Sequence, residues 1–170
     1  RKDVETDGRF AKICYTQSWE EDATRRDFTV NALYMDREGE IFDPLGTGLL
    51  DTQKRIIRFV GDPTQRIQED ALRILRFYRF STQIGNNSVD AFGLKACREN
   101  AALLKTLSRE RITDETFKIC SINTYQNDPT SILKIMYNNN IFSEISHATP
   151  DLDTFHHIVN FQKRYDLYNE

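Results

Sequence analysis

Short runs of alternating apolar and polar residues fill the first sixty positions, and this pattern predicts strands more than helices. Residues 10–16 (FAKICYT) alternate as a half-buried strand does, and residues 28–36 and 39–44 suit a hairpin with its turn at 37–39. Three smaller elements are expected: a charged helix or turn at 20–27, one or two helical turns at 49–55, and a short strand at 56–60 that ends at Gly61.

After Gly61 the apolar spacing changes to the period that is typical of helices. Asp62 and Pro63 form a start signal, because Asp caps a helix and Pro loses no hydrogen bond at the first position. The first helix should reach about Ile84, roughly 33 Å at about 1.5 Å per residue. Four more are expected at about 90–104, at 108–123 with Ser108 as its cap, from Asp128-Pro129 to the Asn run at 138–140, and at 153–168. The pattern therefore predicts an α+β fold, with strands before Gly61 and helices after it.

The charge is unevenly distributed along the chain. The net charge of -3 over 170 residues argues against a general nucleic-acid binder, since affinity for phosphate needs local positive charge. The segment from Lys54 to Arg79, however, holds seven positive residues and three negative ones, so it carries +4 and the rest -7. An anionic partner is therefore expected to meet the middle of the chain.

Composition adds two expectations about the environment. The three cysteines, Cys14, Cys97 and Cys120, form no C-x-x-C pair and are interpreted as reduced, mostly buried thiols in a reducing, cytoplasm-like compartment. No apolar run approaches the length of about 18–20 residues that a membrane span requires, so no membrane partner is expected. The three histidines have no carboxylate or Cys at ligand spacing, and no metal site is predicted there.

The stretch EDALRILRFYRF (69–80) has two contrasting faces when it is placed on a helix. One broad face is apolar and is the predicted core face; it holds Ile67, Ala71, Ile74, Leu75 and Tyr78. The opposite half holds Arg66, Glu69, Asp70, Arg73, Arg76 and Arg79, with Phe77 and Phe80 among them. A solvated face with ion pairs worth about 0.2–0.5 kcal/mol each would account for the charges. The use of Arg for all the later charges favours planar, bidentate donation instead, and the two aromatic residues favour a face that meets a flat or apolar partner.

An adjacent Asp and Arg have a defined chemistry toward a nucleotide base. A carboxylate only accepts hydrogen bonds and a guanidinium only donates them. Together they match the amino donor and ring-nitrogen acceptor that cytosine and adenine present, whereas uracil and guanine place a carbonyl where the amino group would be. A fixed Asp–Arg pair would therefore select C and A without a nucleic-acid template, and further Arg residues would serve phosphates.

Five segments in order resemble one family. EDALRILR (69–76) resembles the E-D-x-x-R-x-x-R nucleotide-recognition motif of class II tRNA nucleotidyltransferases, the CCA-adding enzymes, and of the related bacterial poly(A) polymerases. The others are RRDFTVNALY (25–34), the linker DPLGTGLLDTQKRIIRFVG (43–61) with Thr52 where Leu is usual, SRERITDETFKI (108–119), and DVETDGRFA (3–11) with Phe10 in place of His. The resemblance covers about residues 1–120.

The resemblance implies a domain order and a set of site residues. Residues 1–61 would form part of a nucleotidyltransferase head, 62–124 a helical neck with the recognition helix, and 125–170 the start of a helical body. The implied nucleotide-binding residues are Arg26 and Asp27 at the phosphate and ribose, Asp70 and Arg73 at the base edge, and Arg76 and Arg79 at the phosphates. Glu69 would orient Arg73, and Glu110 would support the recognition helix.

The resemblance also implies what this chain does not contain. The G-G-x-V-R-D loop and the D-x-D carboxylates that bind Mg²⁺ in the family would lie upstream of Arg1, so no catalytic or metal-binding residue is assigned here. The chain is therefore expected to be an inactive piece of a longer enzyme that adds CCA to tRNA 3′ ends from CTP and ATP. Three alternatives remain open: a poly(A) polymerase acting on another RNA 3′ end, an enzyme that adds only CC or only A, and a non-catalytic nucleotide- or RNA-binding module. Oligomeric state is left open.

Overall fold

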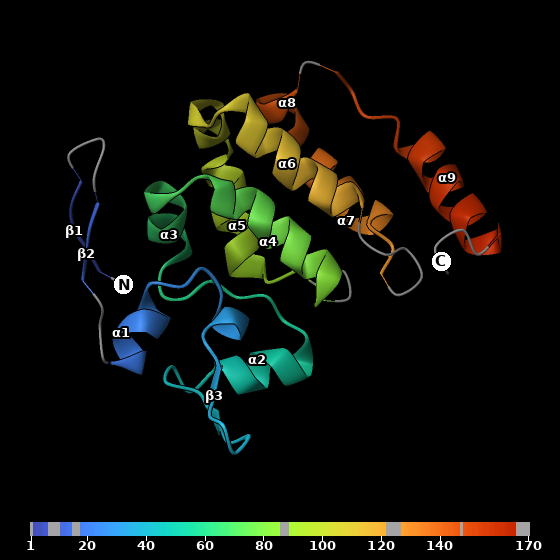
Figure 1. The fold of residues 1–170 in the computed structure, drawn as a ribbon. Coiled ribbons are helices and arrows are strands. Elements are labelled where there is room, and N and C mark those ends of the chain that lie inside the picture. Colours follow the sequence, from blue (N-terminus) through green and yellow to red (C-terminus); the bar gives the residue numbers. More distant parts are fainter. Residues whose placement is uncertain are drawn as a thin grey trace.

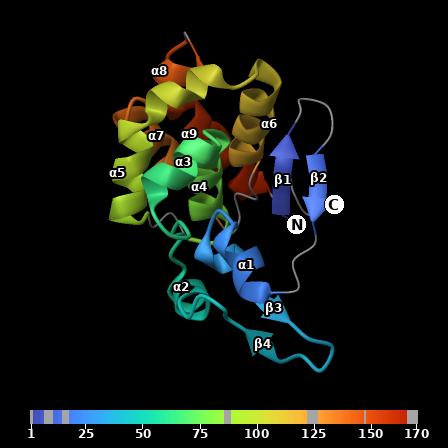
Figure 2. The same ribbon diagram turned by 90° about the vertical axis from the view of Figure 1, so that its left-hand side faces the viewer.

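The computed structural model describes residues 2–6, 11–14, 18–85, 89–121, 127–146 and 148–165. Its N-terminal elements are β1 (Lys2–Thr6), β2 (Ala11–Cys14), α1 (Trp19–Thr24), the short 3-10 helix η1 (Thr29–Asn31), β3 (Tyr34–Met35), β4 (Ile41–Phe42) and α2 (Gly48–Lys54). Strands β1 and β2 pair antiparallel, as do β3 and β4. Figures 1 and 2 show α1, α2 and the β3–β4 hairpin at one end of the molecule, beneath the helices that follow.

The helical part consists of α3 (Pro63–Glu69), α4 (Leu72–Gln83), α5 (Ala91–Glu99), the 3-10 helix η2 (Ala101–Thr106), α6 (Arg109–Cys120), α7 (Thr130–Asn138), α8 (Ile141–Ile145) and α9 (Leu152–Tyr165). The α+β fold class is thus confirmed. The predicted caps Asp62 and Ser108 are also confirmed, since their side chains accept hydrogen bonds from the backbone N–H groups of Gln65 and Arg111. Helix α8 was not predicted, because its five residues are too few to show a period.

The strand predictions succeed only in part. The strand expected at 10–16 is present as β2, while residues 15–17 lie outside the described residues. The predicted hairpin exists, but residues 29–31 form a 3-10 turn, so only two residues of each strand pair. The strand predicted at 56–60 is wrong: an isolated antiparallel bridge joins Phe28 and Phe59, and no ladder extends from it. A strand needs a continuous partner, which an apolar run does not reveal.

The continuous helix predicted to Ile84 is also wrong, because it breaks at Asp70. This residue has extended backbone angles (φ -155°, ψ 106°) between α3 and α4. Its carboxylate accepts a hydrogen bond from the backbone N–H of Leu72 at 3.1 Å and so caps the start of α4. Aspartate favours such local side-chain bonds over the interior of a helix. The break places Glu69 at the end of one helix and Arg73 in the first turn of the next.

Helix α4 lies at the centre of the helical part and contacts α6 and α7 (Figure 1). The predicted core face is confirmed: Ile67, Ala71, Ile74, Leu75 and Tyr78 are all buried. The expectation that Phe77 lies in the charged half is wrong, because its ring is fully buried and stacks on Phe59 with 5.4 Å between centroids. Full burial of such a ring contributes roughly 1.5–3 kcal/mol.

Two expectations about the environment can be compared with the structure. Cys97 and Cys120 are free thiols, buried and partly buried respectively, and burial raises the pKa of each; the side chain of Cys14 lies outside the described residues. Within the described part of the chain, no helix has the length and apolar character needed to cross a bilayer. The proposed boundaries of head, neck and body remain a prediction.

Candidate functional site

The C-terminal end of α3 fixes the guanidinium of Arg73. One nitrogen of this group, Nη1, donates to Oε2 of Glu69 at 2.6 Å and to the backbone carbonyl of Arg66 at 2.9 Å. The side chain of Arg66 bonds the same Glu69 oxygen at 2.8 Å. Partial burial raises the pKa of Glu69, but the bonds and charges of Arg73 and Arg66 outweigh this effect and leave the pKa below its ordinary value. Glu69 therefore contacts Arg73 as the resemblance implied.

The carboxylate of Asp70 is held by α6. Nη2 of Arg111 donates to Oδ1 at 3.1 Å and to Oδ2 at 2.9 Å, in addition to the bond from Leu72. The side chains of Asp70 and Arg111 are 36% and 47% exposed, so the pair can be reached from solvent. A carboxylate accepts about four hydrogen bonds, and three are used here, which leaves one acceptor position on Oδ2. Arg111 was not predicted, although it lies beside Glu110 in the E-R-I segment.

Asp27 joins the N-terminal part of the chain to α4. Its Oδ2 accepts from Nε of Arg76 at 2.7 Å, and its Oδ1 accepts from the backbone N–H of Phe28 and from Nδ2 of Asn31, each at 2.9 Å. The backbone carbonyl of Asp27 also accepts from Val60. The carboxylate is therefore satisfied within the chain and positions Arg76; the contact with a nucleotide implied for Asp27 remains a prediction.

Arg79 is the least exposed of the three α4 arginines. Its Nε donates to Oε1 of Glu115 on α6, and its Nη1 donates to Gln83 at 3.1 Å. Only 14% of the Arg79 side chain and 3% of the Glu115 side chain are exposed. Glu115 was missed, although it is the second Glu of the E-R-I-x-x-E pattern. Glu110, which was predicted as the supporting residue, is exposed, and the observed supports from α6 are Arg111 and Glu115.

Arg26, which follows α1, belongs to a separate cluster around Asp22 of that helix. Its Nε and Nη2 bond Asp22 at 3.0 and 2.6 Å, and the same carboxylate accepts from Arg25 and, at 2.7 Å, from the hydroxyl of Tyr34. Burial raises the pKa of Asp22, but the bonds from Tyr34, Arg26 and Arg25 outweigh it and hold the pKa well below its ordinary value. Trp19 packs on Tyr34 with ring centroids 5.0 Å apart, as a packing residue does.

The break between α3 and α4 places the acceptor Asp70 between the two helices and Arg73, which carries the donor groups, in the first turn of α4. Within the described ranges, Nε and Nη2 of Arg73 make no hydrogen bond, so three of its N–H donors remain for a ligand. Asp70, three residues earlier, keeps one acceptor position. The described residues contain no group of three His, Cys, Asp or Glu side chains that could hold a metal ion, so no metal chemistry is assigned to them.

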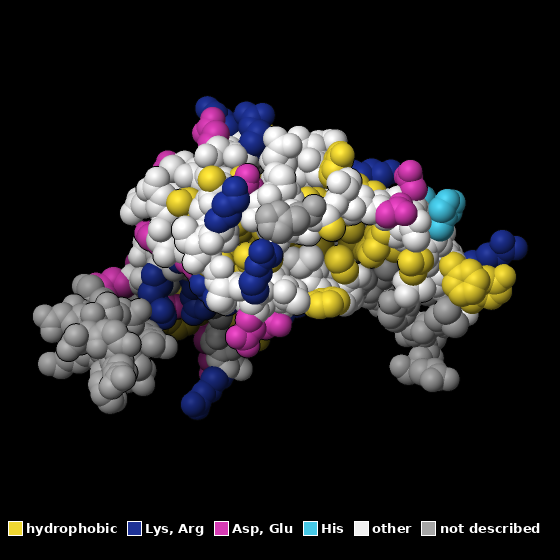
Figure 3. Space-filling model, turned by 90° about the horizontal axis from the view of Figure 1, so that it is seen from above, with side chains coloured by type: hydrophobic (Ala, Val, Ile, Leu, Met, Phe, Trp, Pro, Cys, Tyr) yellow, Lys and Arg dark blue, Asp and Glu magenta, His cyan; other side chains and the backbone are white. Residues whose placement is uncertain are grey.

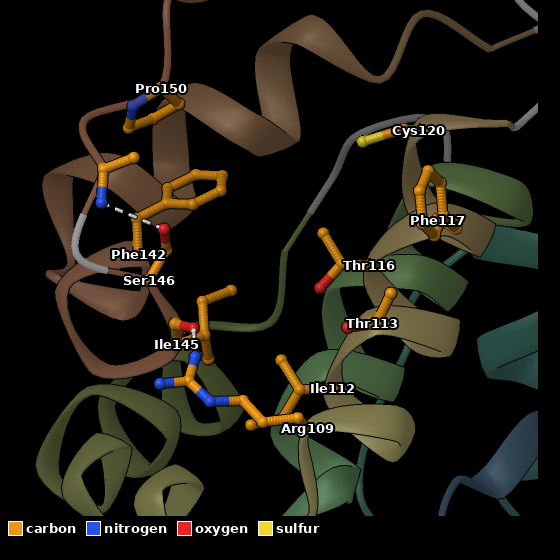
Figure 4. A pocket seen from close by; sticks show the side chains of 11 residues that line it. Arg109, Ile112, Thr113, Thr116, Phe117, Cys120, Phe142, Ile145, Ser146 and Pro150 are labelled. Atoms are coloured by element: carbon orange, nitrogen blue, oxygen red, sulfur yellow. Dashed lines mark hydrogen bonds between the residues drawn. The ribbon is translucent and has the colours of Figure 1, made fainter.

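A cavity of about 460 Å³ lies between α6, α8 and the segment that follows α8 (Figure 4). Its walls are mostly apolar, and Arg109 crosses one end to donate to the carbonyl of Ile145 at 3.1 Å. Apolar side chains also gather on the face seen in Figure 3. Separately, α6 and α9 carry exposed apolar side chains, among them Phe117, Ile158 and Phe161. None of the predicted site residues lines this cavity.

The comparisons with known proteins agree with the sequence motifs. A family model described as the poly A polymerase head domain matches residues 1–58. The mitochondrial CCA tRNA nucleotidyltransferase 1 of Mus musculus is 45% identical over 121 residues, which are 70% of this chain and 28% of that protein. The CCA-adding enzyme of Limosilactobacillus reuteri is 44% identical over 108 residues, 64% of this chain and 26% of the relative.

A solved structure supports the same assignment. The Bacillus stearothermophilus CCA-adding enzyme in complex with CTP has a TM-score of 0.68 and 35% sequence identity, covering 81% of this chain and 32% of that one. The chain thus spans less than a third of the length of these relatives. The ordered motifs and these similarities together show that the chain belongs to the family of class II tRNA nucleotidyltransferases and poly(A) polymerases.

Proposed function

We propose that this chain supplies the nucleotide-selecting part of a template-independent RNA nucleotidyltransferase that adds CCA to tRNA 3′ ends from CTP and ATP. The observation that carries the proposal is the break between α3 and α4. Counting only the described residues, Asp70 keeps one acceptor position and Arg73 keeps three donors. Leu72 and Arg111 hold the carboxylate of Asp70, and Glu69 of α3 holds the guanidinium of Arg73. The names of the relatives, among them an enzyme solved with CTP, support the same function.

The proposed selection rests on the polarity of these two side chains. One oxygen of Asp70 would accept the amino group of cytosine or adenine, and Arg73 would donate to the neighbouring ring nitrogen. Uracil and guanine would oppose the carboxylate with a carbonyl oxygen. Glu69 holds the side chain of Arg73, and Arg111 holds that of Asp70. Because both side chains are already ordered, less conformational entropy would be lost when the base binds.

The remaining site residues would act toward the triphosphate and ribose. Arg76 is the most exposed of the three arginines on α4, at 32%, and would approach phosphate oxygens. Arg26 would do so from the segment that follows α1, where it is 44% exposed. Arg79 and Asp27 would act mainly by placing these groups, since both are engaged inside the chain.

Mg²⁺, which supplies charge neutralisation for phosphoryl transfer, is proposed as the cofactor of the complete enzyme, with ligands outside the described residues. The proposed partners are CTP, ATP and a tRNA 3′ end. A cytoplasmic location is proposed from the reduced cysteines, although the mouse relative carries a mitochondrial name. A poly(A) polymerase is the second candidate, because the matching family model describes a head domain of that name.

The test is nucleotide incorporation by the complete protein into tRNA that lacks CCA, with each of the four triphosphates. Asp70→Ala should reduce the preference for CTP over UTP by about tenfold or more, since a charge-assisted hydrogen bond contributes about 1.5–3 kcal/mol. Asp114→Ala, which removes an exposed carboxylate from α6, serves as the control, and Arg79→Ala should keep the preference. Equal use of UTP and CTP by the unaltered protein would refute base-edge selection, and incorporation of C would exclude a poly(A) polymerase.

A further inference from the structure

The ring of Phe80 forms a contact surface for two guanidinium groups of α4. The Arg79 group lies 4.3 Å from the ring centroid and the Arg76 group 5.4 Å from it. Both distances are within the range of about 6 Å in which the negative face of an aromatic ring attracts a cation. The sequence suggested that Phe80 faces an external partner. In the structure its ring is partly buried and contacts these two guanidinium groups instead.

The same ring is supported from the N-terminal part of the chain. Phe28 packs against Phe80 in an edge-on geometry with 5.5 Å between centroids. The residue before it, Asp27, is the ion-pair partner of Arg76. Asp27 and Phe28 are adjacent, and both contact α4. Asp27 binds Arg76 directly, and Phe28 packs against the Phe80 ring that Arg76 contacts.

The two arginines depend on the ring to different degrees. Arg79 is fixed independently by Glu115 and Gln83, and little of it is exposed. Arg76 has Asp27 as its only ion-pair partner among the described residues and is about a third exposed. The Asp27 bond fixes one edge of its guanidinium, and the Phe80 ring supplies the second contact that limits rotation about that bond.

We propose that Phe80 is a positioning residue that orients Arg76 toward the phosphates of the incoming nucleotide. The inference rests on the proposed function, because it assigns Arg76 to the nucleotide. It follows that the aromatic character of Phe80, and not only its volume, sets the affinity for the triphosphate. A leucine at this position would fill most of the space but present no negative ring face.

The test compares Phe80→Leu, Phe80→Tyr and Phe77→Leu in the complete protein. Phe80→Leu should raise the KM for CTP about three- to tenfold, with kcat within about twofold, as expected for losing about 0.7–1.4 kcal/mol of binding. Phe80→Tyr keeps the ring and should keep the KM of the unaltered protein. Phe77→Leu removes a ring of the same aromatic cluster that contacts no described guanidinium; it should lower Tm without raising KM.

Two results would overturn the inference: an unchanged KM in Phe80→Leu, or an equal rise in Phe77→Leu, which would indicate general loosening. Should Phe80→Leu not fold, Phe80→Met replaces it with the same expected outcome. If the unaltered protein adds no nucleotide, the proposed function fails, and the inference is then tested separately by the affinity for inorganic triphosphate. Phe80→Leu should weaken that binding about three- to tenfold, and equal affinities would refute the role of the ring.

Discussion

Replacing Arg79 by Met is expected to destabilise the protein by about 3 kcal/mol, because it leaves a buried carboxylate without its main partner. Glu115 is 3% exposed, and its remaining contact would be the ammonium of Lys118 at 3.5 Å, a side chain that is itself 56% exposed. Screening at the surface makes such a contact worth little, about 0–1 kcal/mol. Because this contact can still offset up to about 1 kcal/mol, the expected loss lies at the lower end of the 3–5 kcal/mol that is typical for breaking a buried pair.

The assay is thermal unfolding at pH 7, followed by circular dichroism. For a protein of this size about 3 kcal/mol corresponds to a fall of roughly 6–12 °C in Tm. The double variant Arg79→Met, Glu115→Leu replaces both charges by apolar groups of similar length and should recover most of this loss, since an apolar pair is often as stable as the buried ion pair. Glu115→Leu alone should fall between the two, because Arg79 would keep Gln83 and the Phe80 ring.

Two outcomes would refute the reasoning. One is that Arg79→Met and Glu115→Leu each lower the free energy of unfolding by less than about 1 kcal/mol and that their effects add. The Arg79–Glu115 pair would then contribute no more than a solvent-exposed ion pair does. If the double variant of the complete protein is stable but its KM for CTP rises more than about tenfold, about 1.4 kcal/mol of binding, then Arg79 contacts phosphate directly, as its motif position implies.

Two further predictions concern the carboxylates of Asp70 and Asp22. Arg111→Ala should lower the preference for CTP over UTP in the incorporation assay, because the Asp70 side chain could then rotate. Arg111→Lys should restore part of this preference. The control Lys95→Ala, which breaks an exposed ion pair on α5, should leave the preference unchanged. Asp22→Asn should lower Tm at neutral pH. Burial opposes ionisation of Asp22, but the bonds from Tyr34 and the two arginines hold its folded pKa below the ordinary value of 3.8. Its contribution is therefore complete above pH 3.8 and is lost as the pH falls through the folded pKa, so the Tm difference between Asp22→Asn and the unaltered protein should shrink below pH 3.8.

The local signals in the sequence predicted most of the helical part. Caps such as Asp62 and Ser108 act on neighbouring backbone groups, so their effect is readable from a few residues. The apolar period likewise identified the buried face of α4. The break at Asp70 was not predictable in this way, because the apolar period continues through it and part of what holds Asp70 comes from Arg111, 41 residues later. The strand at 56–60 failed for a related reason, since pairing depends on a distant segment.

The contacts that the motif residues make within the chain were only partly predictable from the sequence, and their role toward a nucleotide remains a prediction. Glu69 and Arg73 are four residues apart, so their contact is a local consequence of the chain. Asp27 and Arg76 are 49 residues apart and Arg79 and Glu115 are 36 apart, and only the folded chain brings each pair together. The sequence therefore suggested free arginines where the structure has paired ones.

The pairing explains how three arginines can lie on consecutive turns of one helix. Arg73, Arg76 and Arg79 each bond a different carboxylate, from α3, from the segment after α1 and from α6 respectively. The repulsion expected between neighbouring guanidinium groups is therefore offset before any ligand arrives, and a bound triphosphate is not required to relieve it. Because Arg111 and Asp70 form a fourth pair, the site holds equal numbers of these positive and negative groups. The proposed selectivity for a base should then depend on the directions of the remaining donors and acceptors, which tertiary contacts determine, more than on net positive charge.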